Sequence, residues 1–162
     1  MRRRKRLSNR HEKTRQGSRL CLDAAASPLD RIDEELVEVA RGVMREHYRP
    51  LWHTVAAALR DANGRIWTGL HLGATVGRLQ ICAEAIALGR AKLEGGSEIK
   101  TAVAVRHPKP DEIDQDIDVV SPCGACREMF ADFTPSTMII VSDGQGLIKV
   151  PLSFLLPLPY RR

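Results

Sequence analysis

The sequence predicts an α/β fold in which helices flank a mixed β-sheet. Three observations predict it: apolar residues recur at helical spacing over 30–47, two apolar runs at 53–61 and 65–72 flank a turn, and later helices alternate with strand-like runs. A hairpin followed by strand–helix–strand crossovers gives both antiparallel and parallel strand pairs. With 162 residues, 43% of them hydrophobic, the chain can build one domain around one core.

The formal charge of +5 is divided unevenly along the chain. Residues 1–19 hold nine Lys or Arg and one acid, a charge of +8, so the remainder carries −3. We expect residues 1–27 to be a basic, disordered tail, or sequence upstream of the true start, and residues 28–162 to form the domain. A basic arm can bind phosphates, but this one has no aromatic residue or apolar face, so no nucleic-acid partner is expected.

The first half of the domain is predicted as one helix and one hairpin. Asp30 can cap the helix over 30–47, and acidic residues follow in its first turn. The runs 53–61 and 65–72 form the two strands of the hairpin, because the Asp61-Ala62-Asn63-Gly64 sequence between them has strong turn chemistry.

The second half alternates between helical and strand-like segments. The expected order is helix, strand, helix, strand, strand and a final helical turn, at 82–94, 99–105, 123–132, 137–141, 147–150 and 151–156. Gly95-Gly96 stop the first of these helices, and 107–118 reads as an acidic loop. No run approaches the roughly 20 apolar residues of a membrane span, and no secretory signal is evident, so we expect a cytoplasmic protein without membrane contact.

Two short motifs carry the chemistry, and each lies where a loop becomes a predicted helix. They are Cys82-Ala83-Glu84 and Pro122-Cys123-Gly124-Ala125-Cys126. A Cys-x-x-Cys pair at a helix start can present two thiolates to one ion, and a cysteine at a second helix start supplies a third. Three protein ligands and one open position are typical of catalytic zinc sites, whereas structural sites usually have four ligands. The sequence therefore predicts one zinc ion per chain, bound by Cys82, Cys123 and Cys126.

Glu84 lies two residues after the first predicted ligand. Three thiolates already give zinc ample negative charge, so we interpret Glu84 as a proton carrier beside the metal. Zinc makes hydroxide available near neutral pH, and Glu84 would carry the proton of the water to the ring and then to the leaving amine. The alternatives are thiols that only fill space and a first-turn acid that interacts with the helix dipole.

Together the two motifs resemble the zinc signature of the small cytidine deaminase family. The resemblance covers about residues 30–160 and includes Thr68-Gly69 and Leu155-Leu156-Pro157. It implies a three-layer α/β/α fold around a mixed five-stranded sheet. It also implies a homotetramer, with a dimer as the alternative. The implied reaction removes an exocyclic amine from a cytosine-type nucleoside or nucleoside analogue and releases ammonia, and the implied biological role is pyrimidine salvage.

The same resemblance implies roles for single residues. The backbone around Ala83 and Ser121 would grip the edge of the ring. Arg127, directly after the last cysteine, would balance the charge of the thiolates, or alternatively face solvent. Tyr160 lies near the place where the family sends a C-terminal aromatic side chain toward a neighbouring pocket.

The segment after Thr68-Gly69 departs from the family pattern. Typical members have N-V-E-N-A-S-Y, whose Asn and first Glu hold the ribose hydroxyls, whereas His71 and Gly73 stand at those positions here. The change from Glu to Gly loses a charge-assisted hydrogen bond, so cytidine is not expected to be the best substrate, and Gly73→Glu would favour it. The blasticidin S deaminase branch departs from the ribose motif too. His71 and His53 are candidate substrate contacts, with structural roles as the alternatives.

Two other classes of function remain open. A non-catalytic, zinc-stabilised assembly or binding module derived from a deaminase fits the lost ribose motif, but it has no need of Glu84. A polynucleotide-editing enzyme fits the basic arm, but the acidic body lacks the interleaved Arg and aromatic residues that bind single strands. The expected partner is therefore a small, nucleoside-like substrate.

Overall fold

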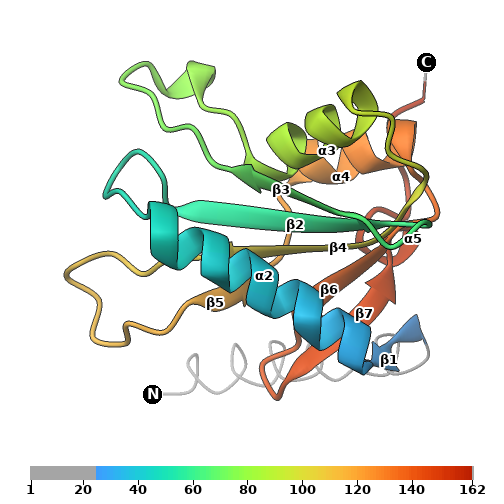
Figure 1. Ribbon diagram of the computed structural model, residues 1–162, viewed down its shortest axis with the longest axis horizontal. Helices are drawn as coiled ribbons and strands as arrows, with labels where there is room; N and C mark the ends of the chain where they lie inside the picture. Colours follow the sequence, from blue (N-terminus) through green and yellow to red (C-terminus); the bar gives the residue numbers. More distant parts are fainter. Residues whose placement is uncertain (1–24, 162) are drawn as a thin grey trace, which may run out of the picture.

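A mixed sheet of seven strands forms the centre of the computed structural model, which describes residues 25–161 (Figure 1). The strands are β1 Ser27–Pro28, β2 Val55–Asp61, β3 Ile66–Leu70, β4 Ile99–Arg106, β5 Asp118–Val120, β6 Met138–Ser142 and β7 Leu147–Pro151. The helices are α2 Arg31–His47, the 3₁₀ turn η1 Gly77–Leu79, α3 Ala83–Leu93, α4 Gly124–Phe133 and α5 Leu152–Leu155. Among the described residues, no helix has both the length and the apolar character needed to cross a membrane.

The strands run side by side in the order β1-β7-β6-β4-β2-β3, with β5 paired to β4. Five strands lie where the sequence predicts them, and β1 and β5 are additions. Both are too short for an alternating pattern to show in the sequence. β1 pairs with β7 through Ser27 and Pro28, and the proline is tolerated because β1 is an edge strand. The sheet thus begins at Ser27, and the basic segment 1–24 lies outside the described residues.

A capping box fixes the start of α2. The Asp30 carboxylate accepts the N–H groups of Ile32 and Asp33, both at 2.9 Å, and the Asp33 carboxylate accepts the N–H of Asp30 at 3.2 Å. These bonds satisfy amides that a helix start would otherwise leave unpaired. The buried face of the helix carries the side chains Leu36, Val37, Ala40 and Met44.

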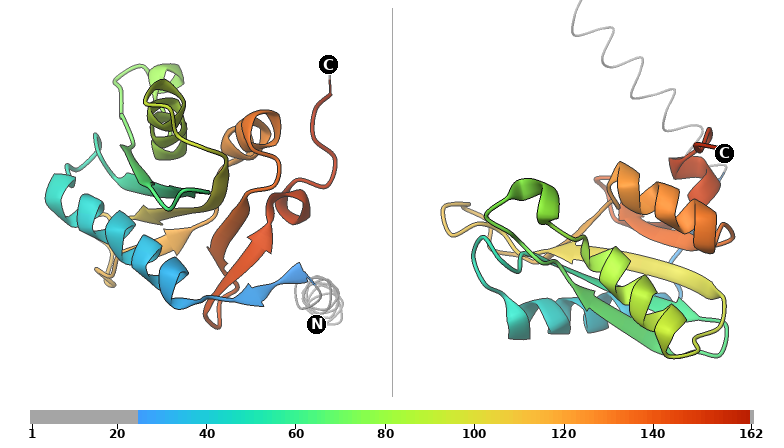
Figure 2. Two further views of the ribbon diagram at one scale, coloured as in Figure 1. Left: turned by 45° about the vertical axis from the view of Figure 1, so that its right-hand side comes forward. Right: turned by 90° about the horizontal axis from the view of Figure 1, so that it is seen from above.

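Helices cover both faces of the sheet, so the three-layer α/β/α prediction is confirmed (Figure 2). α2 packs on one face, while α3 and α4 lie on the other. Alternating residues of β2 serve the two layers: Ala56 and Ala58 belong to the α2 core, and Leu59 belongs to the α3 core. The small side chains of Ala56 and Ala58 let α2 approach the sheet closely, and Ala57 does the same beside Ala83 of α3 on the other face.

The crossovers bring the starts of α3 and α4 to the same end of the sheet. β3 and β4 both pair antiparallel with β2, so they run parallel to each other. Leu70 and Val105 both stand opposite Ala56, which places the carboxyl ends of β3 and β4 on either side of the start of β2. In open α/β sheets, ligands bind at such carboxyl ends. α3 follows β3, and α4 follows the short β5, which pairs with the last three residues of β4.

A buried carboxylate organises the opposite end of the hairpin. One oxygen of Asp61 accepts the N–H groups of Asn63 and Arg65, and the other accepts the N–H of Ser97 and the indole N–H of Trp67. Burial on its own would raise the pKa of Asp61, but these donors outweigh it and hold the pKa below its ordinary value of 3.8. The ionised form is therefore the one that stabilises the fold.

Asp61→Asn is expected to lower the free energy of unfolding by about 1–3 kcal/mol at neutral pH, because an amide nitrogen would face donors that now meet a carboxylate oxygen. The stabilisation from ionised Asp61 is present above pH 3.8 and is lost as the pH falls through the lowered pKa. The difference in the free energy of unfolding between wild type and Asp61→Asn, measured with urea, should therefore decrease at acidic pH. Exposed Asp132 supplies the control, and an equal loss in Asp132→Asn would contradict the assignment.

Candidate metal centre and active site

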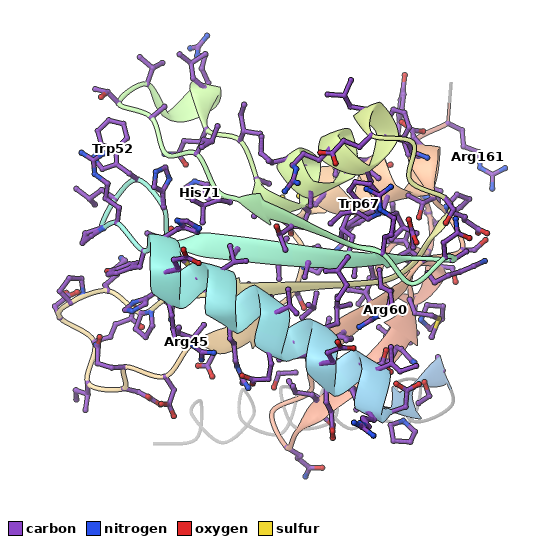
Figure 3. The ribbon with its side chains drawn as sticks, in the orientation of Figure 1. Arg45, Trp52, Arg60, Trp67, His71 and Arg161 are labelled. Atoms are coloured by element: carbon purple, nitrogen blue, oxygen red, sulfur yellow. The ribbon has the colours of Figure 1, made fainter. Side chains whose placement is uncertain are left out.

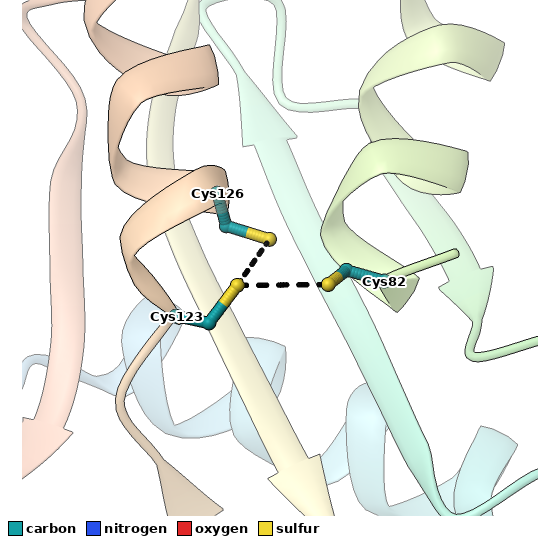
Figure 4. Close-up of side chains that lie close together, drawn as sticks. All are labelled: Cys82, Cys123 and Cys126. Atoms are coloured by element: carbon teal, nitrogen blue, oxygen red, sulfur yellow. Dashed lines mark hydrogen bonds between the residues drawn. The ribbon is translucent and has the colours of Figure 1, made fainter. Parts of the chain in front are cut away.

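Three cysteine sulfurs meet where α3 and α4 begin (Figure 4). Cys82 is the N-cap of α3, Cys123 is the N-cap of α4, and Cys126 lies in the first turn of α4. The sulfur of Cys123 lies 3.6 Å from the sulfur of Cys82 and 3.6 Å from that of Cys126. All three sulfurs lie within 4.8 Å of one another, and within residues 25–161 this is the only such group of possible metal ligands.

The donor set fits zinc. Zn–S bonds of about 2.3 Å in tetrahedral geometry put two sulfurs about 3.8 Å apart, close to the spacing observed here. Cys126 is buried while Cys123 is exposed, so the group is anchored on its inner side and open on its outer side. Three ligands with one open side are what a catalytic zinc site requires.

The three thiols differ in their acid–base properties. Burial raises the pKa of Cys82 and of Cys126. At Cys123 burial acts in the same direction, but hydrogen bonds, including one from the N–H of Cys126, outweigh it and lower the pKa. Cys123 is therefore the thiol that ionises most readily. Cys123 also stands at the start of a helix, where the partial positive charge of the helix N-terminus favours a thiolate.

Glu84 lies beside the three sulfurs and is only 6% exposed. Burial raises the pKa of its carboxyl group, and this effect exceeds the opposing influence of its own N–H, the Cys126 thiol and His71. A raised pKa makes a carboxyl group a better proton acceptor than an ordinary carboxylate, while it can still release the proton again. The residue therefore has the position and the chemistry that a proton carrier needs.

Gly69 sets how closely α3 approaches the sheet. A Cβ atom at this position of β3 would lie 2.2 Å from the carbonyl oxygen of Ala83 and 2.5 Å from the backbone nitrogen of Ala87. The absence of a side chain thus brings the first turn of α3, and with it Cys82 and Glu84, against the strand. The sequence contains Thr68-Gly69 as part of the family resemblance, but it gives no sign of this close approach.

Arg127 holds the backbone around the cysteines. Its guanidinium donates to the carbonyl oxygen of Pro122 at 2.8 Å and to that of Leu155 at 3.0 Å. The predicted role was to balance the charge of the thiolates, whereas its hydrogen bonds run to carbonyl groups. Arg127 therefore ties the loop before Cys123 to the C-terminal segment.

The other predicted contacts lie on two sides of the cysteines. His71 follows β3, and its carbonyl oxygen accepts a hydrogen bond from the His53 ring at 2.9 Å, so these two histidines lie together. His71 is also near enough to influence the pKa of Glu84. Ala83 is buried in the first turn of α3, and Ser121 is exposed just before Cys123. All four therefore stand near the predicted site.

Tyr160 lies apart from them. Its side chain is 77% exposed, and its N–H donates to the carboxylate of Glu128 on α4. It lines a surface cavity of about 850 Å³ together with Phe133, Leu156 and other residues of α4, α5 and the C-terminal segment, none of them a predicted ligand. Within one chain, Tyr160 does not join the cysteine group.

Comparison with known proteins places this fold and site in a family. The cytidine and deoxycytidylate deaminase zinc-binding region matches residues 30–142. Blasticidin-S deaminase of Bacillus cereus is 44% identical over 130 residues, which cover 80% of this chain and 93% of the relative. Cytidine deaminase of Halalkalibacterium halodurans is 32% identical over 105 residues, covering 64% and 74% of the two chains.

Solved structures of cytidine deaminases have the same fold as this chain. The cytidine deaminase from Bacillus anthracis superposes with a TM-score of 0.69 at 21% identity, over 80% of this chain and 90% of that one. The chain belongs to the cytidine and deoxycytidylate deaminase family. Deaminases of this family are hydrolases that act on C–N bonds.

Gly69→Ala is expected to lower the free energy of unfolding by about 3 kcal/mol, because the new Cβ must push α3 off the strand. Gly89→Ala is the matched control, since a Cβ there meets nothing within 4 Å. It should instead stabilise α3 by about 0.5–1 kcal/mol. Denaturant unfolding of both variants measures the difference, and equal effects would mean that the close approach at Gly69 does not matter.

Proposed function

We propose that this protein is a zinc-dependent hydrolytic deaminase that removes the exocyclic amine of a cytosine-type nucleoside or nucleoside analogue. The observation that carries the proposal is the buried Glu84 carboxyl group beside a three-thiol group that is open on one side. Cys82, Cys123 and Cys126 would hold one zinc ion per chain. The names of the relatives, a blasticidin-S deaminase and a cytidine deaminase, support this class of substrate.

The reaction adds water to the amine-bearing carbon of the ring and expels ammonia. The zinc ion would make hydroxide available as the nucleophile near neutral pH. Glu84 would take one proton of the water and transfer it to the ring nitrogen, and would then take the second proton from the hydroxyl group now on the carbon and deliver it to the leaving amine. A C–O bond forms, the C–N bond breaks, and the product carries a carbonyl group in place of the amine.

Other residues would hold the ring in place. The first N–H groups of a helix have no partner within the helix, so the N–H of Ala83, the first residue of α3, would bind the ring edge. Ser121 would bind the same edge from the opposite side, since it precedes Cys123 in the loop before α4. His71 and His53 would contact the substituent on the ring, and Arg127 would keep the loop before Cys123 in position.

The non-catalytic alternative rests on Gly73, which cannot bind a ribose with a side chain. The buried Glu84 favours the enzyme. Burying a carboxyl group costs free energy, and a zinc site that serves only structure has no use for a proton carrier beside it.

The active form is proposed to be a homotetramer, with a dimer as the alternative. Phe133 and Tyr160 are exposed around the cavity at the C-terminal segment, and a neighbouring subunit would cover them and receive Tyr160. A cytoplasmic location and a part in pyrimidine salvage stay predictions from the sequence.

Glu84→Gln is expected to abolish ammonia release while leaving the fold and the metal content unchanged. The amide cannot carry the proton, so the rate should fall at least about 10³-fold. The assay covers cytidine, deoxycytidine, free cytosine and blasticidin S, with zinc-loaded protein. Glu34→Gln, an exposed change in α2, is the control. Wild-type turnover in Glu84→Gln would disprove the mechanism.

Cys123→Ser is expected to reduce bound zinc from one ion per chain to well below one, because the weaker ligand leaves two thiolates. Elemental analysis after dialysis measures the content. Cys21→Ser is the matched control, because Cys21 lies outside the described residues and is no part of the three-thiol group. Loss of zinc from both variants alike would argue against the assigned ligands.

A further inference from the structure

The three thiols of the candidate metal centre differ in how far each is open to solvent. Cys123 is exposed and Cys82 is intermediate, whereas Cys126 is buried, with only 2% of its surface accessible. Residues 124 and 125, which separate the two cysteines of α4, are exposed as well. A small solute can therefore reach the sulfur of Cys123, while the sulfur of Cys126 is shielded behind it.

The position of the thiols in the fold keeps this approach open. Figure 3 shows His71, which follows β3, at one end of the sheet and Trp67 nearer the other end. The thiols lie toward the His71 end, where α3 and α4 begin. A Cβ atom at Gly124, the first residue of α4, would meet nothing within 4 Å. The described chain therefore leaves the start of α4 uncovered.

Two sulfurs lie equally far from that of Cys123, but they differ in how they can come closer. The sulfur of Cys126 is 3.6 Å away in the first turn of the same helix. The sulfur of Cys82 is also 3.6 Å away, but it belongs to α3, which packs directly on β3 at Gly69. A disulfide requires a separation of about 2.05 Å. Cys126 needs only side-chain rotation within one turn, whereas Cys82 requires α3 and α4 to move toward each other.

We propose that Cys123 and Cys126 form a redox switch, in which a hydroperoxide converts the metal-free pair to a disulfide that prevents zinc binding. An exposed cysteine beside a second thiol that can resolve its first oxidation product is typical of redox sensors. The disulfide would remove two of the three ligands, and Cys82 alone is too few for a zinc site. The regulatory role rests on the proposed deaminase function, whereas the oxidation itself needs only the thiols.

The oxidation takes two steps. Hydrogen peroxide transfers one oxygen atom to the sulfur of Cys123, which becomes a sulfenic acid, and one water molecule is released. The thiol of Cys126 then attacks that sulfur: the S–S bond forms, the S–O bond breaks, and the hydroxyl group leaves with the thiol proton as a second water. A dithiol reductant reverses the reaction by exchange and ends as its own disulfide. Zinc and the disulfide use the same sulfurs, so each excludes the other.

Peptide mapping tests the proposal, because trypsin leaves Cys123 and Cys126 in one peptide, 107–127, and Cys82 in another, 79–90. Chelator-treated, reduced protein is exposed to equimolar hydrogen peroxide, alkylated and digested. Peptide 107–127 should be lighter by two hydrogen atoms and resist alkylation, whereas in zinc-loaded protein it should be fully alkylated. Dithiothreitol should restore both alkylation and zinc binding. A cross-link between the two peptides, or the same oxidation with zinc bound, would overturn the proposal.

Variants of single cysteines identify the pair. In Cys126→Ser the second step is blocked, so oxidation of the metal-free chain should stop at a sulfenic acid on Cys123, which dimedone labels. Cys82→Ser should form the same disulfide as the parent chain, and so should the matched control Cys21→Ser. Absence of the disulfide from Cys82→Ser, or a cross-link to Cys82 in Cys126→Ser, would contradict the assigned pair.

Ammonia release from the same samples separates the switch from the proposed function. It is measured on zinc-loaded protein, and on oxidised and re-reduced protein after zinc is added back. A disulfide that blocks zinc binding, in a protein that shows no turnover in any state, would uphold the switch and refute the deaminase. Turnover that survives peroxide treatment of the metal-free chain, with no disulfide in the peptide map, would refute the switch and uphold the deaminase.

Discussion

The close contact between α3 and β3 at Gly69 determines where the chemistry of this protein can occur. The backbone of Ala83 and Ala87 lies where a side chain of residue 69 would otherwise be. The start of α3 is thereby fixed to the strand, and β5, which pairs with the carboxyl end of β4, leads into α4 at the same end of the sheet. The sulfurs and the Glu84 carboxyl group then meet at the two helix starts, although a connection of twelve residues separates β3 from α3.

The site brings together groups whose burial or ionisation costs free energy in the absence of a cation. A buried carboxyl group, two thiols whose pKa is raised by burial and one exposed thiol share a small volume. Each of these groups resists ionisation or crowds another negative charge. A divalent cation relieves all of them together, which gives a physical reason for their concentration at two helix starts.

The sequence predicts the layers, five strands and the cysteine group correctly, because helical spacing, hairpin turns and the Cys-x-x-Cys motif are local signals. It misses β1 and β5, which have two and three residues and so no period to detect. It gives no sign that Arg127 donates to the carbonyl groups of Pro122 and Leu155, since carbonyl acceptors leave no mark in a sequence. It also gives no sign that the backbone of Leu51 and Trp52 fills the space beside Gly73, because that segment lies about 20 residues earlier in the chain.

The spacing of the cysteines along the chain has a consequence for how the protein is made. Cys82 and Cys123 stand 41 residues apart, and β4 and β5 must be in place before α4 can bring its cysteines to α3. An ion that needs all three sulfurs would therefore bind the folded chain, in which α3 and α4 already meet. The binding free energy of such an ion would add to the stability of the folded state, so removal of the metal would weaken the contact between α3 and α4 as well as the chemistry.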